Sequence, residues 1–373
     1  MNILILNWRD IQDPKAGGAE LVTMEHAKYW VTKGHKVTWL TSRFPGSKES
    51  EVFEDIQFVR KGNAISIYLI APFYYLINRK KFDVVIDEIH GLPFFTPLYS
   101  KKNIAFIHEV AGEIWDYMYP FPISKIGKFI ENLYFKFYKN TLFWTDATST
   151  VDELVQKGIP RKNCHAIPCP VDIVFAAQLP KKEENPTFIF VSRLVKMKGI
   201  ESILEAFSYI KGELPKAQLW IVGGGEKKYL NYLKRIVSGK KIVESVTFYD
   251  FVSQTKKVEL LSKAHILLHA SVKEGWGLVI LEAGSQMTPS VVYNVPGLRD
   301  SVKNNITGIL VRENSPIQLG ISAVSLYNDK KMYEQMQKNA YNWSKSLKWE
   351  DVAEESLALI IEVTLSQQGL KRK

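Results

Sequence analysis

The stretch Lys273–Glu282 reads KEGWGLVILE and closely follows a short apolar run, His265–Ala270 (HILLHA). This order predicts a strand, a glycine-rich turn and a helix, which is the repeating junction of an α/β sheet. Gly275 and Gly277 allow a tight turn and a close backbone approach to a ligand. The free N–H groups of the following helix would then suit a phosphate. The same junction is also common where no ligand binds, so a purely structural interpretation stays open.

Four charged side chains are expected beside this turn. Glu274 and Glu282 bracket it, and acids next to an anion site make sense when they accept hydrogen bonds from sugar or ribose hydroxyls. Arg193 and Lys198 lie in another strand–turn–helix junction, VSRLVKMKG. Because parallel strands end at one sheet edge, we expect all four there, where the two cations can clamp a diphosphate. Taken singly, such cations are more often surface charges, and only the combination with the two glutamates favours a binding role.

The N-terminal half opens with a strand–loop–helix–strand unit. We predict a strand at Asn2–Trp8, a helix at Ala19–Lys33 and a strand at Lys36–Thr41. Gly17 and Gly18 precede that helix, where a backbone can meet a phosphate, but they do not form the GxGxxG pattern of nicotinamide enzymes. Further strands are predicted at Ile56–Arg60, Val84–Asp87, Ile104–His108 and Ala147–Thr150.

Two histidines lie at or just after predicted strand ends, the edge where open parallel sheets bind ligands. We interpret His108 as functional, whereas His90, in the sequence IHGLP, is more simply part of a turn. The remaining histidines are interpreted as packing or surface residues: His26, His35, His165, His265 and His269.

The domain organisation follows from composition. Residues 169–186 are rich in proline and charge, so we predict an N-terminal domain over 1–168, a linker over 169–186 and a C-terminal domain over 187–345. In the second domain the expected strands are Thr187–Ser192, Gln218–Val222, Val246–Tyr249, Ile266–His269, Ser290–Tyr293 and Gly308–Val311. Two α/β domains with parallel sheets and a short linker predict an inter-domain cleft, where small-molecule sites tend to lie.

Composition narrows the class of protein. The 373 residues are 46% hydrophobic and 24% charged, as in soluble globular proteins. No secretory signal and no run of about 18 apolar residues is present, so we expect a cytoplasmic protein. Cys164 and Cys169 form neither a disulfide framework nor a complete metal-ligand set. The net charge of +10 predicts attraction to polyanions without choosing among nucleic acid, anionic lipid and phosphorylated substrate.

Residues Ile123–Trp144 (ISKIGKFIENLYFKFYKNTLFW) predict an amphipathic helix with an apolar face opposite a lysine face. The simpler interpretation is a packed helix whose lysines are solvated. The alternative is contact with an anionic membrane surface, which would place the protein on the inner face of the cytoplasmic membrane. No RNA- or DNA-binding motif accompanies the basic residues, so we expect no nucleic-acid partner.

The motifs, taken in order, resemble those of the retaining glycosyltransferases of family 4 (GT4), which have the GT-B fold. Glu274–Glu282 resembles the E-x7-E motif of that family, with Trp276 where phenylalanine is usual, and Ser192–Gly199 is similar to its diphosphate-binding segment. The early GGAE, the VGGG turn at Val222–Gly225 and the FVS before a helix also occur in the expected order. The resemblance covers nearly the whole chain, but Asn294–Asp300 (NVPGLRD) departs from the usual Gly-Gly-Pro-Glu-like turn.

The resemblance implies two facing Rossmann-like domains, with a C-terminal helix (350–366) joined to the first. It implies that Glu282 binds ribose hydroxyls, Glu274 binds the donor sugar, and the amides of Gly277 and Leu278 hold sugar and phosphate. It also implies that Arg193 and Lys198 bind the diphosphate and that the base lies near Phe251 and Val252. The loop at Gly17 and Gly18 would close on the donor, and His108 would lie near the sugar. His108, Glu274, Arg193 and Lys198 would form the catalytic set.

The implied reaction moves a hexose from a UDP- or GDP-sugar to a glycan or lipid-linked acceptor in cell-envelope synthesis. Cationic side chains and a helix N-terminus would stabilise the leaving diphosphate, so we expect no metal and no cofactor beyond the donor substrate. A nucleotide-sugar epimerase or hydrolase with a similar fold is one alternative. A non-catalytic subunit of a glycan-assembly complex is another.

Overall fold

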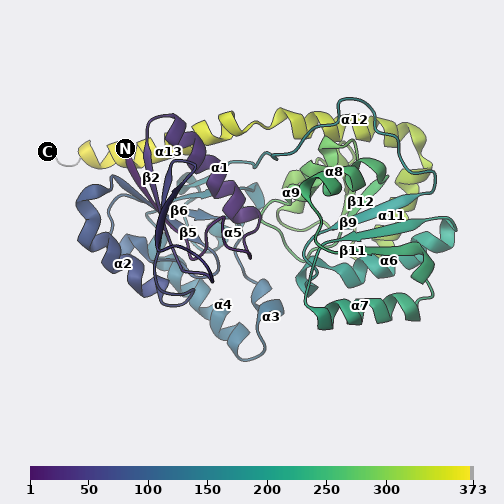
Figure 1. The fold of residues 1–373 in the computed structure, drawn as a ribbon, viewed down its shortest axis with the longest axis horizontal. Coiled ribbons are helices and arrows are strands. Elements are labelled where there is room, and N and C mark those ends of the chain that lie inside the picture. The colour runs from purple at the N-terminus through teal and green to yellow at the C-terminus, as the bar shows by residue number, and fades with distance from the viewer. Residues whose placement is uncertain (370–373) are drawn as a thin grey trace. The chain divides into compact units, whose positions relative to one another are not determined.

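The computed structural model of the chain describes residues 1–369. It contains two compact units, each built around its own sheet (Figure 1). Unit 1 comprises Met1–Cys169 and the C-terminal segment that begins at Lys348, and unit 2 comprises Pro170–Leu347. No helix within residues 1–369 is both long and apolar enough to cross a bilayer.

The sheet of unit 1 has the strand order β3-β4-β2-β1-β5-β6-β7-β8. All neighbouring strands are parallel except β3 and β4, which are antiparallel. The strands are β1 (Asn2–Leu6), β2 (Lys36–Thr41), β3 (Ser50–Phe53), β4 (Ile56–Arg60), β5 (Val84–Ile89), β6 (Asn103–Ile107), β7 (Leu142–Thr145) and β8 (Cys164–Ala166).

Helices cover both faces of this sheet. On one face, α1 (Gly18–Thr32) packs against α13 (Trp349–Gly369), where the Trp30 indole donates to Ser356 Oγ at 3.1 Å. The opposite face is covered by apolar side chains of α2 (Ile67–Asn78) and of the segment that follows α4 (Ile123–Tyr134). The other helices are α3 (Ile114–Met118), α5 (Thr148–Gln156), η1 (Arg79–Lys81), η2 (Thr96–Leu98), η3 (Phe135–Tyr138) and η4 (Arg161–Asn163).

Two predictions for unit 1 are wrong, and they concern the adjacent stretches Ile123–Trp144 and Ala147–Thr150. The helix predicted to reach Trp144 ends at Tyr134, and Leu142–Thr145 forms strand β7 instead. Trp144 is fully buried and stacks on Phe106 of the neighbouring strand β6 at a ring separation of 3.8 Å. The strand predicted at Ala147–Thr150 is the start of α5, because the chain has already left the sheet. The antiparallel edge strand β3 was not predicted.

The sheet of unit 2 is wholly parallel, in the order β11-β10-β9-β12-β13-β14. Its strands are β9 (Thr187–Val191), β10 (Gln218–Val222), β11 (Val246–Tyr249), β12 (Ile266–His269), β13 (Ser290–Val292) and β14 (Gly308–Leu310). Of the predicted linker 169–186, Cys169 belongs to unit 1 and residues 170–186 group with unit 2, where Glu183 N–H donates to Lys263 O and Ala176 N–H to Ser285 O.

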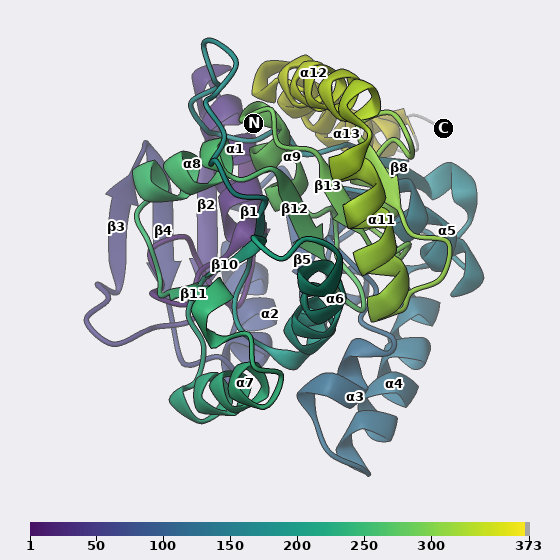
Figure 2. The same cartoon turned by 90° about the vertical axis from the view of Figure 1, so that its right-hand side faces the viewer.

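The helices of unit 2 lie on both sides of the sheet: α6 (Ile200–Glu213) and α7 (Lys227–Gly239) on one side, α8 (Gln254–Lys263) and α9 (Leu278–Ser285) on the other (Figures 1 and 2). The remaining helices are α10 (Leu298–Ser301), α11 (Pro316–Asn328), α12 (Lys330–Ser346), η5 (Lys196–Lys198) and η6 (Val243–Ser245). This alternation makes unit 2 a doubly wound α/β sheet.

Both sheets contain a point where the direction of winding reverses. In unit 1 it lies between β1 and β5, and in unit 2 between β9 and β12. Ligands of open α/β sheets bind outside the carboxyl ends of the strands at such a point, because the loops of the two strands turn to opposite faces and leave a crevice. The loops after these four strands are therefore the first places to look for a site in each unit.

Candidate active site

In unit 2, the predicted residues Glu274 and Lys198 form a direct ion pair. The Lys198 ammonium lies 2.7 Å from each carboxylate oxygen of Glu274. Glu274 Oε1 also accepts a hydrogen bond from Ser271 Oγ at 2.7 Å and lies 2.9 Å from His269 Nε2. Glu274 comes from the loop after β12 and Lys198 from the loop after β9, so the pair lies where the winding reverses.

The environment of Glu274 keeps its carboxyl ionised. Burial alone would raise the pKa of Glu274, but the Lys198 ammonium and the bond from His269 outweigh burial and hold the pKa well below its usual range. A carboxylate held in this state accepts hydrogen bonds and does not serve as a general acid near neutral pH. Its chemistry suits the hydroxyls of a sugar.

Two glycines let the backbone pass close to this pair. A Cβ on Gly199 would lie 1.9 Å from Ala270 O, and a Cβ on Gly297 would lie 2.1 Å from Glu274 O. Both residues have positive φ angles, +70° and +81°, which favour glycine. Gly297 lies in NVPGLRD, the segment that departs from the family pattern, and it nevertheless packs directly against Glu274.

The second predicted acid, Glu282, lies on α9 and is paired with a lysine that the sequence did not single out. Lys257 Nζ donates to Glu282 Oε1 at 2.7 Å, and both side chains are partly buried. Gly277, with a φ of +89°, is the N-cap of α9, and Leu278 is the first residue of the helix. The first N–H groups of a helix have no partners within it, so this end of α9 can bind an anion.

Three further predicted residues lie at the same sheet edge of unit 2. Arg193 follows β9 and is exposed, and its guanidinium forms no ion pair with any residue that the structure describes. Phe251, which follows β11, exposes 90% of its surface, and Val252 is half-buried beside it. The edge therefore offers the Arg193 guanidinium and an exposed aromatic ring.

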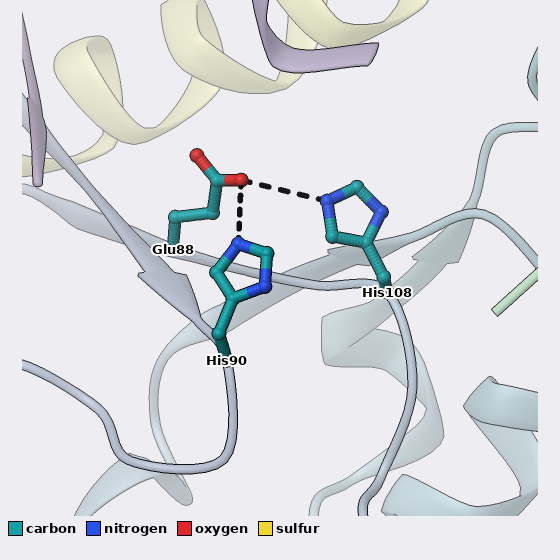
Figure 3. Close-up of side chains that lie close together, drawn as sticks. All are labelled: Glu88, His90 and His108. Atoms are coloured by element: carbon teal, nitrogen blue, oxygen red, sulfur yellow. Dashed lines mark hydrogen bonds and ion pairs between the residues drawn. The ribbon is translucent and has the colours of Figure 1, made fainter. Parts of the chain in front are cut away.

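In unit 1, His108 lies between two buried carboxylates (Figure 3 shows one of them). His108 Nδ1 is 2.5 Å from Asp146 Oδ2, and its Nε2 is 3.5 Å from Glu88 Oε1. His90 Nε2 lies 2.9 Å from the same Glu88 oxygen. The four side chains come from the carboxyl ends of β5, β6 and β7.

The charges in this cluster support one another. Burial alone would lower the pKa of His108, but Asp146 and Glu88 together raise it to about 10. Burial would likewise raise the pKa of Glu88, but His108 and His90 lower it to about 2. His108 is therefore an imidazolium held in a fixed orientation at neutral pH.

The predicted glycine loop of unit 1 precedes α1. Gly17 and Gly18 are both exposed, and Gly17 N–H donates to Glu20 Oε2 at 2.7 Å. The buried Glu20 also accepts from Arg9 Nε at 2.8 Å, which joins the loop after β1 to the helix. The backbone of this loop is therefore exposed, while the contacts of Glu20 hold the loop in place.

Sequence reasoning missed several members of these clusters. His269 was expected to be a packing residue, and instead it contacts Glu274. Asp146 was not detectable, because it follows β7, a strand that the sequence did not predict. Glu88 and His90 are two positions apart, a spacing that directs strand side chains to one face. Lys257 carries no such signal, since it is one lysine among many on an exposed helix.

Two family models match the chain. One describes "Glycosyl transferases group 1" and matches residues 173–343. The other describes "Glycosyltransferase Family 4" and matches residues 16–175. Together they cover most of both units.

Curated relatives and solved structures agree with these matches. N-acetyl-alpha-D-glucosaminyl L-malate synthase of Bacillus anthracis is 24% identical over 88% of this chain and 89% of its own length. Several other relatives are matched over only 31% to 50% of their own length.

Sucrose-phosphate synthase of Thermosynechococcus elongatus has a TM-score of 0.80 at 16% identity, covering 98% of this chain and 99% of that one. HepE of Anabaena, solved with UDP-glucose, has a TM-score of 0.73 at 17% identity, covering 96% and 99%. These likenesses show that the chain has the GT-B fold.

Proposed function

The chain belongs to glycosyltransferase family 4, and from this membership we propose that it transfers a hexose, with retention, from a UDP- or GDP-sugar to a glycan or lipid-linked acceptor. The observation that carries the proposal is the Lys198–Glu274 pair at the point where the unit 2 sheet reverses its winding. The relative named as a glucosaminyl L-malate synthase supports sugar transfer, and the HepE structure with UDP-glucose supports a nucleotide-sugar donor.

The proposed donor contacts follow from the charges. Glycosyl transfer leaves negative charge on the departing diphosphate, and Arg193, Lys198 and the N-terminus of α9 would stabilise that charge without a metal. Lysine sits on a flexible stem, so Lys198 can shift from Glu274 toward the phosphates as the donor binds. Glu274 would then accept hydrogen bonds from the sugar.

The remaining predicted residues receive the roles that the family resemblance implies. Glu282 would bind the ribose hydroxyls, and the amides of Gly277 and Leu278 would hold sugar and phosphate. The base would lie near Phe251 and Val252. From unit 1, we propose that the imidazolium of His108 and the loop at Gly17 and Gly18 also contact the donor.

A donor screen tests the proposal. The full chain is incubated with UDP- and GDP-hexoses, with and without a membrane extract as acceptor source, and nucleotide release is measured. We expect release from one donor that depends on the acceptor and disappears in Lys198→Ala. Lys196→Ala is the matched control, because Lys196 is an exposed lysine in the same turn.

The outcomes of the screen separate the alternatives. Release that proceeds equally without acceptor would indicate a hydrolase. Conversion of the donor to an isomer, with no nucleotide released, would indicate an epimerase. The absence of any reaction across the panel with acceptor present would indicate a non-catalytic subunit.

We further propose that unit 1 contacts an anionic membrane through α3 and α4, which project together from unit 1 in Figures 1 and 2. The apolar face of α4 is exposed: its members are Ile123, Ile126, Phe129, Ile130 and Leu133. The helix is held to the unit by its other side, where Gly127 packs on the Trp115 ring and Glu131 accepts from the N–H groups of Ala111 and Gly112. Lysines beside an open apolar face suit anionic lipid.

Liposome flotation tests this surface. We expect the protein to float with anionic vesicles at low salt and Phe129→Asp to remain in solution. Val243→Asp is the matched control, because Val243 is a similarly exposed apolar residue of unit 2. Equal flotation of all three proteins, or flotation of none, would refute the proposed surface.

A further inference from the structure

The side chains of the unit 1 cluster are also arranged as possible metal ligands. We propose that Glu88, His90 and His108 bind a divalent transition-metal ion, with Zn²⁺ as the first candidate. Glu88 is the penultimate residue of β5, His90 follows that strand, and His108 follows β6. Figure 3 shows both imidazoles directed at one carboxylate.

The spacing of the three side chains suits one ion. One ligand atom from each residue lies within 4.8 Å of the other two. The two measured separations from Glu88 Oε1 are 2.9 Å to His90 Nε2 and 3.5 Å to His108 Nε2. Tetrahedral zinc with bonds of about 2.0–2.2 Å places its ligand atoms roughly 3.3 Å apart, so small side-chain rotations suffice.

Two buried atoms of the cluster are left without hydrogen-bond partners. Within residues 1–369, neither Glu88 Oε2 nor His108 Nε2 has one, although both atoms are shielded from solvent. Buried polar atoms are nearly always satisfied, and an exception calls for an unseen ligand or ion. A cation bound by the Glu88 carboxylate and by His108 Nε2 would supply the partner that is missing at this position.

The surroundings of His108 resemble the support of a metal ligand. Asp146 faces His108 Nδ1 at 2.5 Å, which directs Nε2 toward Glu88. Asp146 is itself held, because Cys169 Sγ lies 3.1 Å from Asp146 Oδ1. A carboxylate behind a ligating histidine fixes the ring and strengthens the ligand. Two imidazoles and one carboxylate favour Zn²⁺ or Fe²⁺ over Mg²⁺ or Ca²⁺.

The consequence of binding rests on the function proposed above for His108. An ion on Nε2 displaces the proton of the His108 imidazolium to solvent and occupies the nitrogen that would otherwise contact the donor sugar. Metal binding is therefore expected to inhibit transfer, which makes the site regulatory and leaves the transfer chemistry itself independent of metal.

Direct metal binding tests the site without any assay of activity. The chelator-treated full chain is titrated with Zn²⁺ against a chromophoric competitor, and with Co²⁺ while its visible absorption is recorded. We expect one ion per chain, tetrahedral or five-coordinate Co²⁺ bands, and loss of both in His90→Gln and Glu88→Gln. His165→Gln is the matched control, since this half-buried histidine of β8 lies in the same unit.

Each result decides the question. Absence of stoichiometric binding by the wild type, or equal binding by folded His90→Gln, would overturn the site. If the variants fail to fold, as judged by circular dichroism, the wild-type Co²⁺ spectrum decides, because absence of these bands would refute histidine ligation. Zinc that binds as expected but leaves donor turnover unchanged would overturn the inhibitory role and also the proposed contact of His108 with the sugar, while the metal site would stand.

Discussion

The two units place charged side chains at the same topological position but pair them differently. In unit 2 each predicted acid is matched with a lysine, Lys198 with Glu274 and Lys257 with Glu282. In unit 1 the central group is a histidine between two buried carboxylates, Glu88 and Asp146. One arrangement uses long, flexible cations and the other a short ring fixed on both sides.

This difference indicates different tasks. An ammonium on a four-carbon stem can leave its carboxylate and follow a phosphate, so the unit 2 pairs can exchange partners when an anionic donor arrives. The imidazole of His108 cannot move without breaking its contact with Asp146. We therefore propose that unit 2 captures the leaving group and that unit 1 presents a fixed group whose orientation matters.

The largest effect on transfer is expected from the Lys198–Glu274 pair of unit 2. Glu274→Ala and Lys198→Ala should each reduce transfer by about 1,000-fold or more, because each removes charge that acts on the donor. The melting temperature should show that both variants fold. Steady-state kinetics with the donor identified in the screen provide the measurement, and turnover near the wild-type rate in both variants would refute the assignment.

A smaller loss is expected when the support of His108 is removed. Asp146→Asn keeps the shape of the side chain but no longer stabilises the imidazolium, so we expect kcat to fall by about 10- to 100-fold with little change in donor KM. Asp146→Glu should recover part of the rate, because the charge is restored. A change confined to KM, or no recovery by glutamate, would show that Asp146 acts only on structure.

The sequence predicted the bounds of several strands in both units, including Lys36–Thr41 and Ile56–Arg60 of unit 1. In unit 2 the strands Gln218–Val222, Val246–Tyr249 and Ile266–His269 have the predicted bounds, because each is an apolar run between clear turn signals. In unit 1 the run Leu142–Thr145 continues an amphipathic pattern, and only burial against Phe106 makes it a strand.

Several residues of the candidate site could be predicted from the sequence, but the contacts between them could not. Placing Arg193, Lys198 and Glu274 at one sheet edge requires only that parallel strands end together. The ion pair between Lys198 and Glu274 requires that β9 and β12 be neighbours, which depends on the order of the whole sheet. Asp146 is separated from His108 by 38 positions and meets it for the same reason.

The Lys257–Glu282 pair of unit 2 should matter less for transfer than the Lys198–Glu274 pair. Glu282→Ala should raise the donor KM by roughly tenfold with kcat nearly unchanged, as expected when a hydrogen bond to a charged group is lost from both ground and transition states. Lys257→Ala should have a weaker effect in the same direction, because it only positions Glu282. A fall in kcat equal to that of Glu274→Ala would erase the distinction between the two pairs.

The smallest effect is expected from Lys182, a lysine of unit 2 that is penalised by burial. Lys182 is half-buried and donates to Thr288 Oγ1 at 2.7 Å, and burial lowers its pKa from 10.5 to about 7. The folded pKa lies below the unfolded one, so between pH 7 and 10.5 the unfolded chain binds more protons and this group makes stability rise with pH. Lys182→Met should therefore stabilise unit 2 by about 1 kcal/mol at pH 7. The gain should vanish by pH 10.5, where the wild-type lysine is neutral in the folded protein and its burial no longer costs stability. Thermal melts at pH 7 and pH 10.5 measure the difference. A gain that is the same at both pH values would show that added apolar packing, and not removal of a charge, is responsible.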